Sequence, residues 1–487
     1  MCGPHGLGDR HCYDEPIRSV KPGWETIVME REASWKQYPY ALSPDDPELV
    51  FPAAEGDQGA ESNTYYVAGR LRGRASQREW AFLVIFTFND VRKRLRADFY
   101  TLALFDLASG AYGTFSETDL PRPFRIRRQH KLSVARGQLD VAFRGAEGTS
   151  SWTTRRRADG SLEPFSYQVS LFGRDAEGRR MHVELALDTF KPPMPVGGTQ
   201  AGGVKTCMGQ YGTHSYFQSD VRFRGTLEWG DVREEVDGDS GWIDRQWTPR
   251  HLGRHNDWRN RRYRHEWRQI HLDNGMEMSV WLHLDRLRGN RPIPFSGATA
   301  ATPDGRVVAT SEFTVERHSW VRDPDLVRAR SRMTRGAQYL ADRYRLIIPA
   351  WELDVLSEPL VPAPAHALPI EYWSGPTRIR GTVGGRPVRG LGFNERTWVF
   401  ARDFELVDVL RGTLRHLPED AFPASSPGPL ALSDQAWEVD AFLSHGGRAA
   451  AREHLCHRLL PHVEQLAEPH RSHVRQIVDD LEAALQR

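Results

Sequence analysis

The chain has 487 residues, 39% of them hydrophobic and 26% charged, and its formal net charge is +1 at pH 7. This composition is that of a soluble globular protein with more than one core. The near-neutral charge gives no whole-molecule field that would favour nucleic acid or an anionic membrane as a partner. Four scattered cysteines without C-x-x-C spacing argue against a disulfide scaffold or a structural zinc site. No apolar run approaches the ~20 residues of a membrane span, and residues 1–16 lack the apolar core of a signal peptide, so we expect a cytoplasmic protein without stable membrane insertion.

The first four-fifths of the chain predict β-structure. Residues 1–60 are rich in Pro, Asp and Glu with little periodicity, and we expect an irregular arm laid over the body. Short apolar segments separated by turns fill residues 61–235, for example around Ser109-Gly110. A second series of the same style covers 236–416, with a turn at Gly384-Gly385. Short strands without interleaved helices predict two antiparallel β-barrels of related build.

The C-terminal part has a different pattern. Residues 417–430 contain four prolines and predict a linker. Ser433 is expected to cap the helix that follows. Helical spacing predicts three helices, over Asp434–Leu443, Arg448–Leu466 and Arg471–Gln486. Residues 431–487 therefore predict a small all-α appendage, which we interpret as a packing module or a homodimer contact rather than a catalytic unit.

The most informative segment is His265–Asp285. A three-residue turn, Asp273-Asn274-Gly275, with the glycine in the left-handed conformation, sets the pairing of two strands. One face of this hairpin is then largely aliphatic. The other face carries the pairs His265–His283, Trp267–Trp281, Gln269–Ser279 and His271–Glu277. Opposed tryptophans are rare on a solvated face and three histidines are rare in a core, so we interpret this mixed face as a cavity lining. A solvated face covered by another segment is the alternative.

Asp244 lies just upstream, within Gly241–Trp247, where a tryptophan stands on each side of it. One interpretation is a structural lock, in which the carboxylate binds Arg245 or the backbone at a strand start. The other is a carboxyl group desolvated by indoles, whose raised pKa would let it act as a general acid. The pattern leaves both interpretations open.

Two further patterns in the sequence have more ordinary explanations. His265, His271 and His283 could approach one another on strands, and imidazole is a common metal ligand. No compact ligand motif of known spacing accompanies them, so we expect no metal. The run 250–268 is dense in arginine, but no nucleic-acid motif accompanies it, and we expect a solvated loop rather than a nucleic-acid surface.

Four segments resemble a known family. Ser215–Arg222 looks like an "S-Y-Y-x-S-x-x-R" strand, and Val236–Trp247 looks like the "W-x-D-[RH]-[QE]-W" segment that follows it. Gly381–Glu395 is similar to a glycine-rich closing element, and Tyr65–Leu71 to an opening "G-x-L" strand. These segments lie within residues 63–400. Together they make the chain resemble the hydroxyneurosporene synthase (carotenoid 1,2-hydratase) and AttH family.

The resemblance implies two lipocalin-like β-barrels and a hydrophobic, polyunsaturated substrate more firmly than one reaction. Family activities include hydration of isoprenoid double bonds, hydration of a prenylated phenol and ring-forming reactions on polyenes. The family's "D-H-x-W" residues correspond to Asp244 and Trp247, with Arg245 at the histidine position. A later strand bears Trp281 and His283 where the hydratases carry tyrosine and aspartate.

We therefore expect an enzyme, a hydratase-type lyase or a cyclase, that protonates a double bond of a hydrophobic polyene without a cofactor. Aromatic faces would stabilise the carbocation. A pericyclase, which needs only a shaped cavity, and a non-catalytic lipophile carrier are the alternatives. The expected catalytic residues are Asp244, His283 and His271. The expected substrate-binding residues are Trp247, Trp267, Trp281, Arg245, Tyr216, Tyr66 and Glu395.

Overall fold

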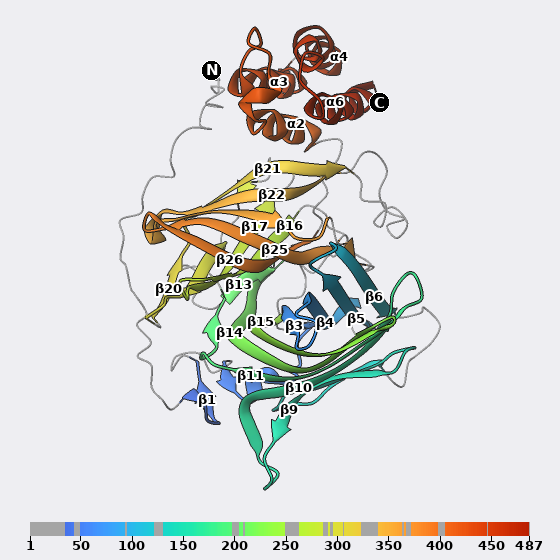
Figure 1. The fold of residues 1–487 in the computed structure, drawn as a ribbon, viewed down its shortest axis with the longest axis vertical. Helices are drawn as coiled ribbons and strands as arrows, with labels where there is room; N and C mark the ends of the chain where they lie inside the picture. Colours follow the sequence, from blue (N-terminus) through green and yellow to red (C-terminus); the bar gives the residue numbers. More distant parts are fainter. Residues whose placement is uncertain are drawn as a thin grey trace, which may run out of the picture.

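The computed structural model describes residues 35–42, 49–92, 95–120, 130–196, 204–207, 210–248, 263–285, 291–292, 296–304, 306–322, 339–362, 365–366, 372–397, 405–445 and 447–486. Within these residues the protein is mainly β, with two large, curled antiparallel sheets and a small group of C-terminal helices (Figure 1). The expected fold class, two lipocalin-like β-barrels with a helical appendage, is confirmed in the form of two half-barrels. No helix among the described residues is long and apolar enough to cross a membrane.

The first half-barrel is a 13-stranded sheet. Its strands are β3 (Ser62–Gly73), β4 (Glu79–Arg92), β5 (Leu95–Asp106), β6 (Ala111–Asp119), β7 (Leu132–Val134), β8 (Asp140–Arg144), β9 (Thr149–Arg156), β10 (Leu162–Arg174), β11 (Arg180–Thr189), β12 (Met194–Pro195), β13 (Val204–Cys207), β14 (Gln210–Trp229) and β15 (Val232–Thr248). The main path runs β6-β5-β4-β3-β15-β14-β11-β10-β9-β8-β7. The expected boundary after residue 235 falls inside β15, which pairs with β14 and β3 and so belongs to this sheet.

The second half-barrel is an 11-stranded sheet with the main path β20-β19-β17-β16-β26-β25-β23-β22-β21. Its strands are β16 (Tyr263–Leu272), β17 (Glu277–Asp285), β18 (Arg291–Pro292), β19 (Gly297–Ala301), β20 (Val307–Thr310), β21 (Thr314–Arg322), β22 (Tyr339–Ile348), β23 (Leu353–Pro359), β24 (Ala365–His366), β25 (Tyr372–Val383) and β26 (Arg386–Thr397). In Figure 1 this sheet lies above the strongly curved first sheet.

Side-chain alternation divides most apolar residues of the two sheets into three cores, and a fourth core lies between the second sheet and the C-terminal helices. On β3, Tyr65 and Val67 point into the first half-barrel, whereas Tyr66 and Ala68 point toward the second. The second half-barrel has its own aliphatic core, which includes Ile270. The middle core, formed by residues of both sheets, is here called the inter-sheet junction. Apolar burial on the face of β3 that carries Tyr66 and Ala68 helps to hold the two half-barrels together.

The described part of the N-terminal arm is built into the first half-barrel. It contains the short strands β1 (Tyr40–Ala41) and β2 (Val50–Phe51) and a 3-10 turn, η2 (Ala53–Glu55). Phe51 and Ala54 are fully buried in the first core. The expectation of an arm laid over the body is therefore wrong for these residues, because their apolar side chains fill the core instead of covering it.

The helical segment begins earlier than expected. It comprises α2 (Leu406–Arg415), η7 (Glu419–Ala421), α3 (Pro429–His445), α4 (Gly447–His454), the π-helical turn η8 (Leu455–Leu459), α5 (Leu460–Val463) and α6 (His470–Gln486). The first and third expected helices are present, whereas the stretch expected as one helix over Arg448–Leu466 is divided into α4, η8 and α5. Ser433 is not a cap, because α3 already starts at Pro429, a residue whose missing N–H costs nothing in a first turn.

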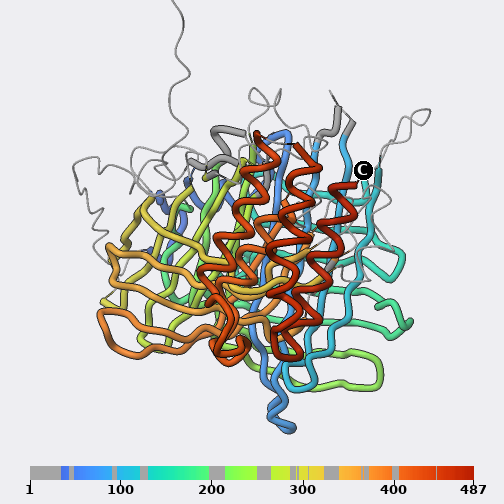
Figure 2. Tube along the Cα trace, turned by 90° about the horizontal axis from the view of Figure 1, so that it is seen from above, coloured from blue at the N-terminus to red at the C-terminus, as the bar shows by residue number. Residues whose placement is uncertain are grey.

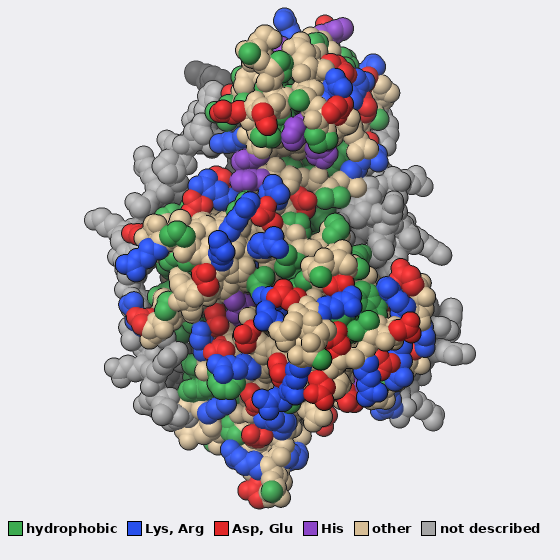
Figure 3. Space-filling model, viewed as in Figure 1, with side chains coloured by type: hydrophobic (Ala, Val, Ile, Leu, Met, Phe, Trp, Pro, Cys, Tyr) green, Lys and Arg blue, Asp and Glu red, His purple; other side chains and the backbone are tan. Residues whose placement is uncertain are grey.

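These helices pack on the second half-barrel (Figure 1), and in the view from above they lie side by side in front of the sheets (Figure 2). Trp320 of β21 packs against α2 at Gly412. Arg322 binds Asp480 of α6 through two hydrogen bonds of 2.6 and 2.9 Å, and the Tyr339 hydroxyl donates to the same carboxylate at 2.7 Å. Figure 3 shows histidines gathered at this boundary. The rings of His318 and His416 stack with 3.9 Å between their centres.

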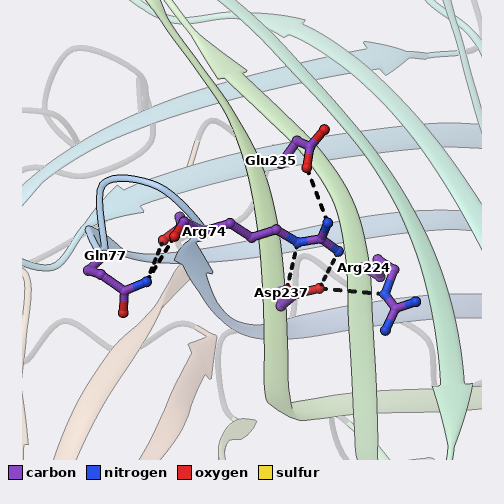
Figure 4. A network of polar contacts seen from close by, with 6 residues as sticks. Arg74, Gln77, Arg224, Glu235 and Asp237 are labelled. Carbon is purple, nitrogen blue, oxygen red and sulfur yellow. Dashed lines mark hydrogen bonds and ion pairs between the residues drawn. The ribbon is translucent and has the colours of Figure 1, made fainter.

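An exposed ion-pair network lies on the first sheet where β3 ends, beside β15 and β14 (Figure 4). Arg74, which follows β3, binds Asp237 of β15 at 2.7 Å and Glu235 at 3.1 Å, and Arg224 of β14 approaches Asp237 at 3.7 Å. Because these side chains are 41–80% exposed, water and salt screen the pairs and they add little to stability.

The contact between α2 and β21 leads to a stability prediction. A Cβ atom at Gly412 would overlap the ring of Trp320, which is buried and cannot swing away. Gly412→Leu should therefore destabilise the protein by about 1–2 kcal/mol, since overpacking costs about 1–3 kcal/mol and the gain in helix propensity returns less than about 1 kcal/mol. The urea unfolding midpoint measures the loss. Gly428→Leu is the matched control, because nothing lies within 4 Å of a Cβ atom there, and equal midpoints for the two variants would contradict the prediction.

Candidate functional site

The site is built where the first sheet faces the second. In the register of three neighbouring strands, Asp244 on β15 stands beside Phe217 on β14 and Tyr66 on β3. These three side chains share one face with Trp242, whose indole stacks on Phe217 at 4.4 Å. Asp244 is only 7% exposed, and Ser215 lies 3.5 Å from its Oδ1. A buried carboxylate thus stands in an aromatic setting on the face that points at the second half-barrel.

The β16–β17 hairpin has the predicted register. His265 pairs with His283, Trp267 with Trp281 and His271 with Glu277, and Gly275 adopts φ 84° in the turn. Every residue of the mixed face is buried, between 0 and 9% exposed. The mixed face is therefore not solvated; it packs against the first sheet at the inter-sheet junction.

Trp267 joins the two sheets. Its ring meets Tyr66 edge-on at 5.3 Å and Trp242 at 6.0 Å, and both of these belong to the first sheet. Its indole Nε1 donates to the Ser279 hydroxyl at 3.0 Å. The polar edge of Trp267 is thus fixed within its own hairpin, while its apolar ring faces the aromatic side chains next to Asp244.

Glu395 of β26 is the centre of a second polar group. The Tyr372 hydroxyl donates to its Oε2 at 2.6 Å, and His265 Nε2 lies 3.0 Å from its Oε1. Trp281 stacks on His265 at 4.8 Å, and its Nε1 donates to His283 Nε2. The expected residues His283, Trp281 and Glu395 are thus linked in one continuous network.

The phenols of this region are held in the protonated form. Burial, with the charge of Glu395 next, raises the pKa of both Tyr66 and Tyr372 well above 10. The charge of Asp244 adds to the shift of Tyr66. Both hydroxyls therefore remain hydrogen-bond donors at every physiological pH, beside carboxylates from both sheets.

His271 lies at the other end of the same face. Its Nδ1 is 3.4 Å from Oε1 of Glu277, whose Oε2 forms an ion pair with Lys191 at 2.8 Å. Burial alone would raise the pKa of Glu277, but His271 and Lys191 outweigh burial and lower that pKa to about 2. Nε2 of His271 has no hydrogen-bond partner in the part of the chain that the structure describes. A carboxylate on one ring nitrogen and an unpaired second nitrogen suit an oriented proton acceptor.

A narrow cleft with a free volume of about 10 Å³, space for about one water molecule, reaches His271. Its walls include Gln269, His271 and Phe393 from the second sheet and Arg70, Ala81 and Leu107 from the first. The His271 ring at the wall of this cleft is perpendicular to the ring of Trp242, with 5.6 Å between their centres.

Three of the expected binding residues lie elsewhere. Arg245, Trp247 and Tyr216 point into the first half-barrel, on the face of the sheet opposite to Asp244. The guanidinium of Arg245 donates to the Gly56 carbonyl, to Asn63 Oδ1 and to the Tyr65 hydroxyl at 2.7–2.8 Å. The structure therefore does not bring these residues together with the inter-sheet cluster; Arg245 ties the N-terminal arm to the sheet instead.

The interior of the first half-barrel also holds a residue that the sequence analysis missed. Glu55 accepts hydrogen bonds from Tyr167 at 2.6 Å and from Tyr38 at 3.1 Å. Burial raises the pKa of its carboxyl group to about 7, against the opposing effect of the two phenols and Arg245. No periodicity around Glu55 indicated a buried position, because the arm enters the core as an irregular segment.

Among the described residues, no group of three or more His, Cys, Asp and Glu side chains is arranged to hold a metal ion. His265 and His283 lie with their rings 5.9 Å apart, but each is engaged with Glu395 or Trp281. His271 stands with Glu277 at the other end of the hairpin.

The low pKa of Glu277 leads to a prediction of pH-dependent stability. A carboxyl group whose pKa falls from 4.5 to about 2 on folding contributes stability that is complete above pH 4.5 and is lost as the pH falls toward 2. Glu277→Gln should therefore be less stable than the native chain at pH 7, by up to about 3 kcal/mol, and the gap should close between pH 4.5 and 2. Urea midpoints over this range measure the gap. Glu453→Gln, at an exposed position, should show no such trend, and a gap that stays constant with pH would contradict the prediction.

Comparisons with known proteins agree with this fold. A family model described as AttH-like matches residues 43–397. An AttH-like protein of Nitrosomonas europaea is 16% identical and aligns over 74% of this chain and 99% of its own, with a TM-score of 0.50. Kievitone hydratase from Nectria haematococca is 15% identical over 71% of this chain and 92% of its own, also with a TM-score of 0.50. No curated protein sequence matches the chain significantly. The family model covers most of the chain, including both half-barrels, and the chain therefore belongs to the AttH-like family.

Proposed function

We propose that this protein is an enzyme that protonates a double bond of a hydrophobic, isoprenoid-type molecule at the inter-sheet junction, and so promotes its hydration or cyclisation. The observation that carries the proposal is the placement of Asp244: a carboxyl group that is 7% exposed, on the same face as Trp242 and opposite Trp267.

Acid-promoted chemistry on a double bond needs a buried acid and aromatic rings close to each other. Protonation of an alkene requires an acid in a site from which water is largely excluded, because water competes for the proton. The resulting carbocation is attracted to the faces of aromatic rings. Trp242 and Trp267, whose rings are 6.0 Å apart, offer such faces, and Asp244 is the proton donor that we assign.

Removal of the final proton, or activation of water, needs a base. His271 suits this role because Glu277 orients its Nδ1, its buried Nε2 has no partner among the described residues, and the residue lines the cleft. His283, linked through Trp281 and His265 to Glu395, is the second candidate. Capture of the cation by water gives a hydratase, and capture by another double bond gives a cyclase.

The fold neighbours are compatible with this assignment. Kievitone hydratase has a similar fold, and hydration is the reaction that its name states. Family membership and the aromatic junction support a hydrophobic substrate, while the choice between water and a second double bond depends on the substrate itself.

Asp244→Asn tests the role of the acid. The variant should lose turnover by about 10²–10⁴-fold, the usual contribution of a general acid, and should still bind the substrate. Farnesol and lycopene serve as linear isoprenoid probes, with product analysis by mass spectrometry. Asp237→Asn is the matched control, because Asp237 lies on the same strand, is half-exposed and belongs to the surface network of Figure 4.

Reactions in D₂O and in H₂¹⁸O separate the mechanisms. Deuterium on carbon is expected for protonation, and ¹⁸O in the product marks hydration as opposed to cyclisation. A pericyclic reaction would incorporate neither isotope and would survive Asp244→Asn. Probes that bind but yield no product would identify a carrier, and either of these results would contradict the proposal.

A further inference from the structure

A cluster of charged side chains lies on the concave face of the second half-barrel, on the side of β16 opposite to Trp267. It consists of Glu266 and Arg268 from β16, Arg317 from β21 and Arg396 from β26. Arg268 and Arg396 are each 1% exposed, and Glu266 is 2% exposed. Strands β16 and β21 are distant in the sheet order, so the contact between Glu266 and Arg317 crosses the hollow of the curled sheet. The expectation of a solvated basic loop over 250–268 is wrong for these two residues of β16.

The carboxylate of Glu266 is shared by two of the arginines. Its Oε2 accepts from Nη2 of Arg268 at 2.7 Å, and its Oε1 accepts from Nη2 of Arg317 at 2.7 Å. Arg396 stands directly opposite Glu266 in the strand register, but its guanidinium has neither of these bonds. Its carbon Cζ instead lies 5.0 Å from the ring centre of Tyr344 and 5.1 Å from that of Trp373.

Arg268 and Arg396 approach each other at Tyr344. Cζ of Arg268 is 4.2 Å from the centre of the same ring, so the two guanidinium carbons lie within about 9 Å of each other. Nε and Nη1 of Arg268 and Nε and Nη2 of Arg396 are buried and have no hydrogen-bond partner among the described residues. These four N–H-bearing nitrogens lie around one aromatic residue, whose hydroxyl interacts with Arg268 but cannot satisfy all four of them.

The charges of the cluster do not balance. Three guanidiniums face one carboxylate, so the four groups carry a formal excess of two positive charges. Burial, and the charges of Arg268 and Arg317, lower the pKa of Arg396 despite the opposing effects of Glu266 and Tyr344. A buried cation without a partner is costly, and arginine gives up its proton in almost no protein environment. An anion bound here would both supply acceptors for these N–H groups and offset the excess charge.

We propose that this arginine cluster is a binding site for a dianionic phosphate group. A phosphate dianion balances the two excess charges, whereas a carboxylate balances only one. Its oxygens can accept from both guanidiniums at once, and the planar fork of arginine matches phosphate in a two-point contact. The phosphate is either the free ion or the terminal group of an organic phosphate, and the two share this chemistry.

The phosphate site is independent of the proposed catalytic site. Alternation along β16 points Glu266 and Arg268 into the second half-barrel and Trp267 toward the first sheet. The two sites are therefore separated by the thickness of the sheet. Asp244→Asn should leave phosphate binding unchanged, so either proposal can fail while the other stands.

The test is a titration of the full-length chain, exchanged into buffer free of phosphate and sulfate. Calorimetry with inorganic phosphate should show one equivalent bound, and the thermal midpoint should rise with phosphate concentration. Arg396→Gln should weaken phosphate binding at least tenfold. Arg389→Gln is the matched control, since Arg389 is exposed on the same strand β26, and it should bind as the native chain does.

Glycerol 3-phosphate distinguishes the source of the group. Tighter binding of the ester than of inorganic phosphate supports an organic phosphate ligand, and the reverse supports the free ion. The proposal is overturned if sodium chloride at the same ionic strength shifts the midpoint as much as phosphate does, or if Arg396→Gln binds phosphate normally. Phosphorus NMR of the native chain decides the question even if the variant does not fold, because absence of line broadening on addition of protein also overturns the site.

Discussion

The central strands of the first sheet are buried on both faces, and the rest of the structure depends on this constraint. Tyr65 and Tyr66, neighbours on β3, are 0 and 3% exposed, one in the first core and one in the inter-sheet junction. A strand of this kind has no solvated face on which to leave a polar group, so each polar side chain must find a partner inside the protein. Arg245 finds its partners on one face and Asp244 faces the junction on the other. Consecutive residues thus serve two chemically different interiors.

The same alternation explains why only part of the site could be predicted. The hairpin register followed from the local turn at Gly275 and from period-two alternation, and both required only neighbouring residues. The motif around Asp244, by contrast, was treated as one site although Asp244 and Trp247 are three residues apart and therefore lie on opposite faces of a strand. Period two, applied to this strand as it was to the hairpin, would have separated them.

Other features depend on contacts that no local pattern reveals. Lys191 reaches Glu277 across 86 positions of sequence, and Glu55 enters the first core from an arm without periodicity. The arginine run was assigned to a loop because charged residues are usually solvated. Glu266 and Arg268 are buried instead because the curled sheet brings Arg317 and Tyr344 over them. A rule based on residue type fails where tertiary closure supplies a counter-charge.

The two half-barrels also divide the chemistry between them. At the junction, carboxylates, phenols and imidazoles lie among indoles, an arrangement in which protons can be held and moved while water is kept out. Inside the second half-barrel, guanidiniums exceed carboxylates, and an arginine cannot take part in proton transfer. The aromatic junction thus suits a reaction on an apolar substrate, and the arginine cluster suits retention of an anion. Strand β16 contributes to both the junction and the arginine cluster. A ligand bound at the arginine cluster would therefore shift Trp267 at the junction only by moving this strand as a whole.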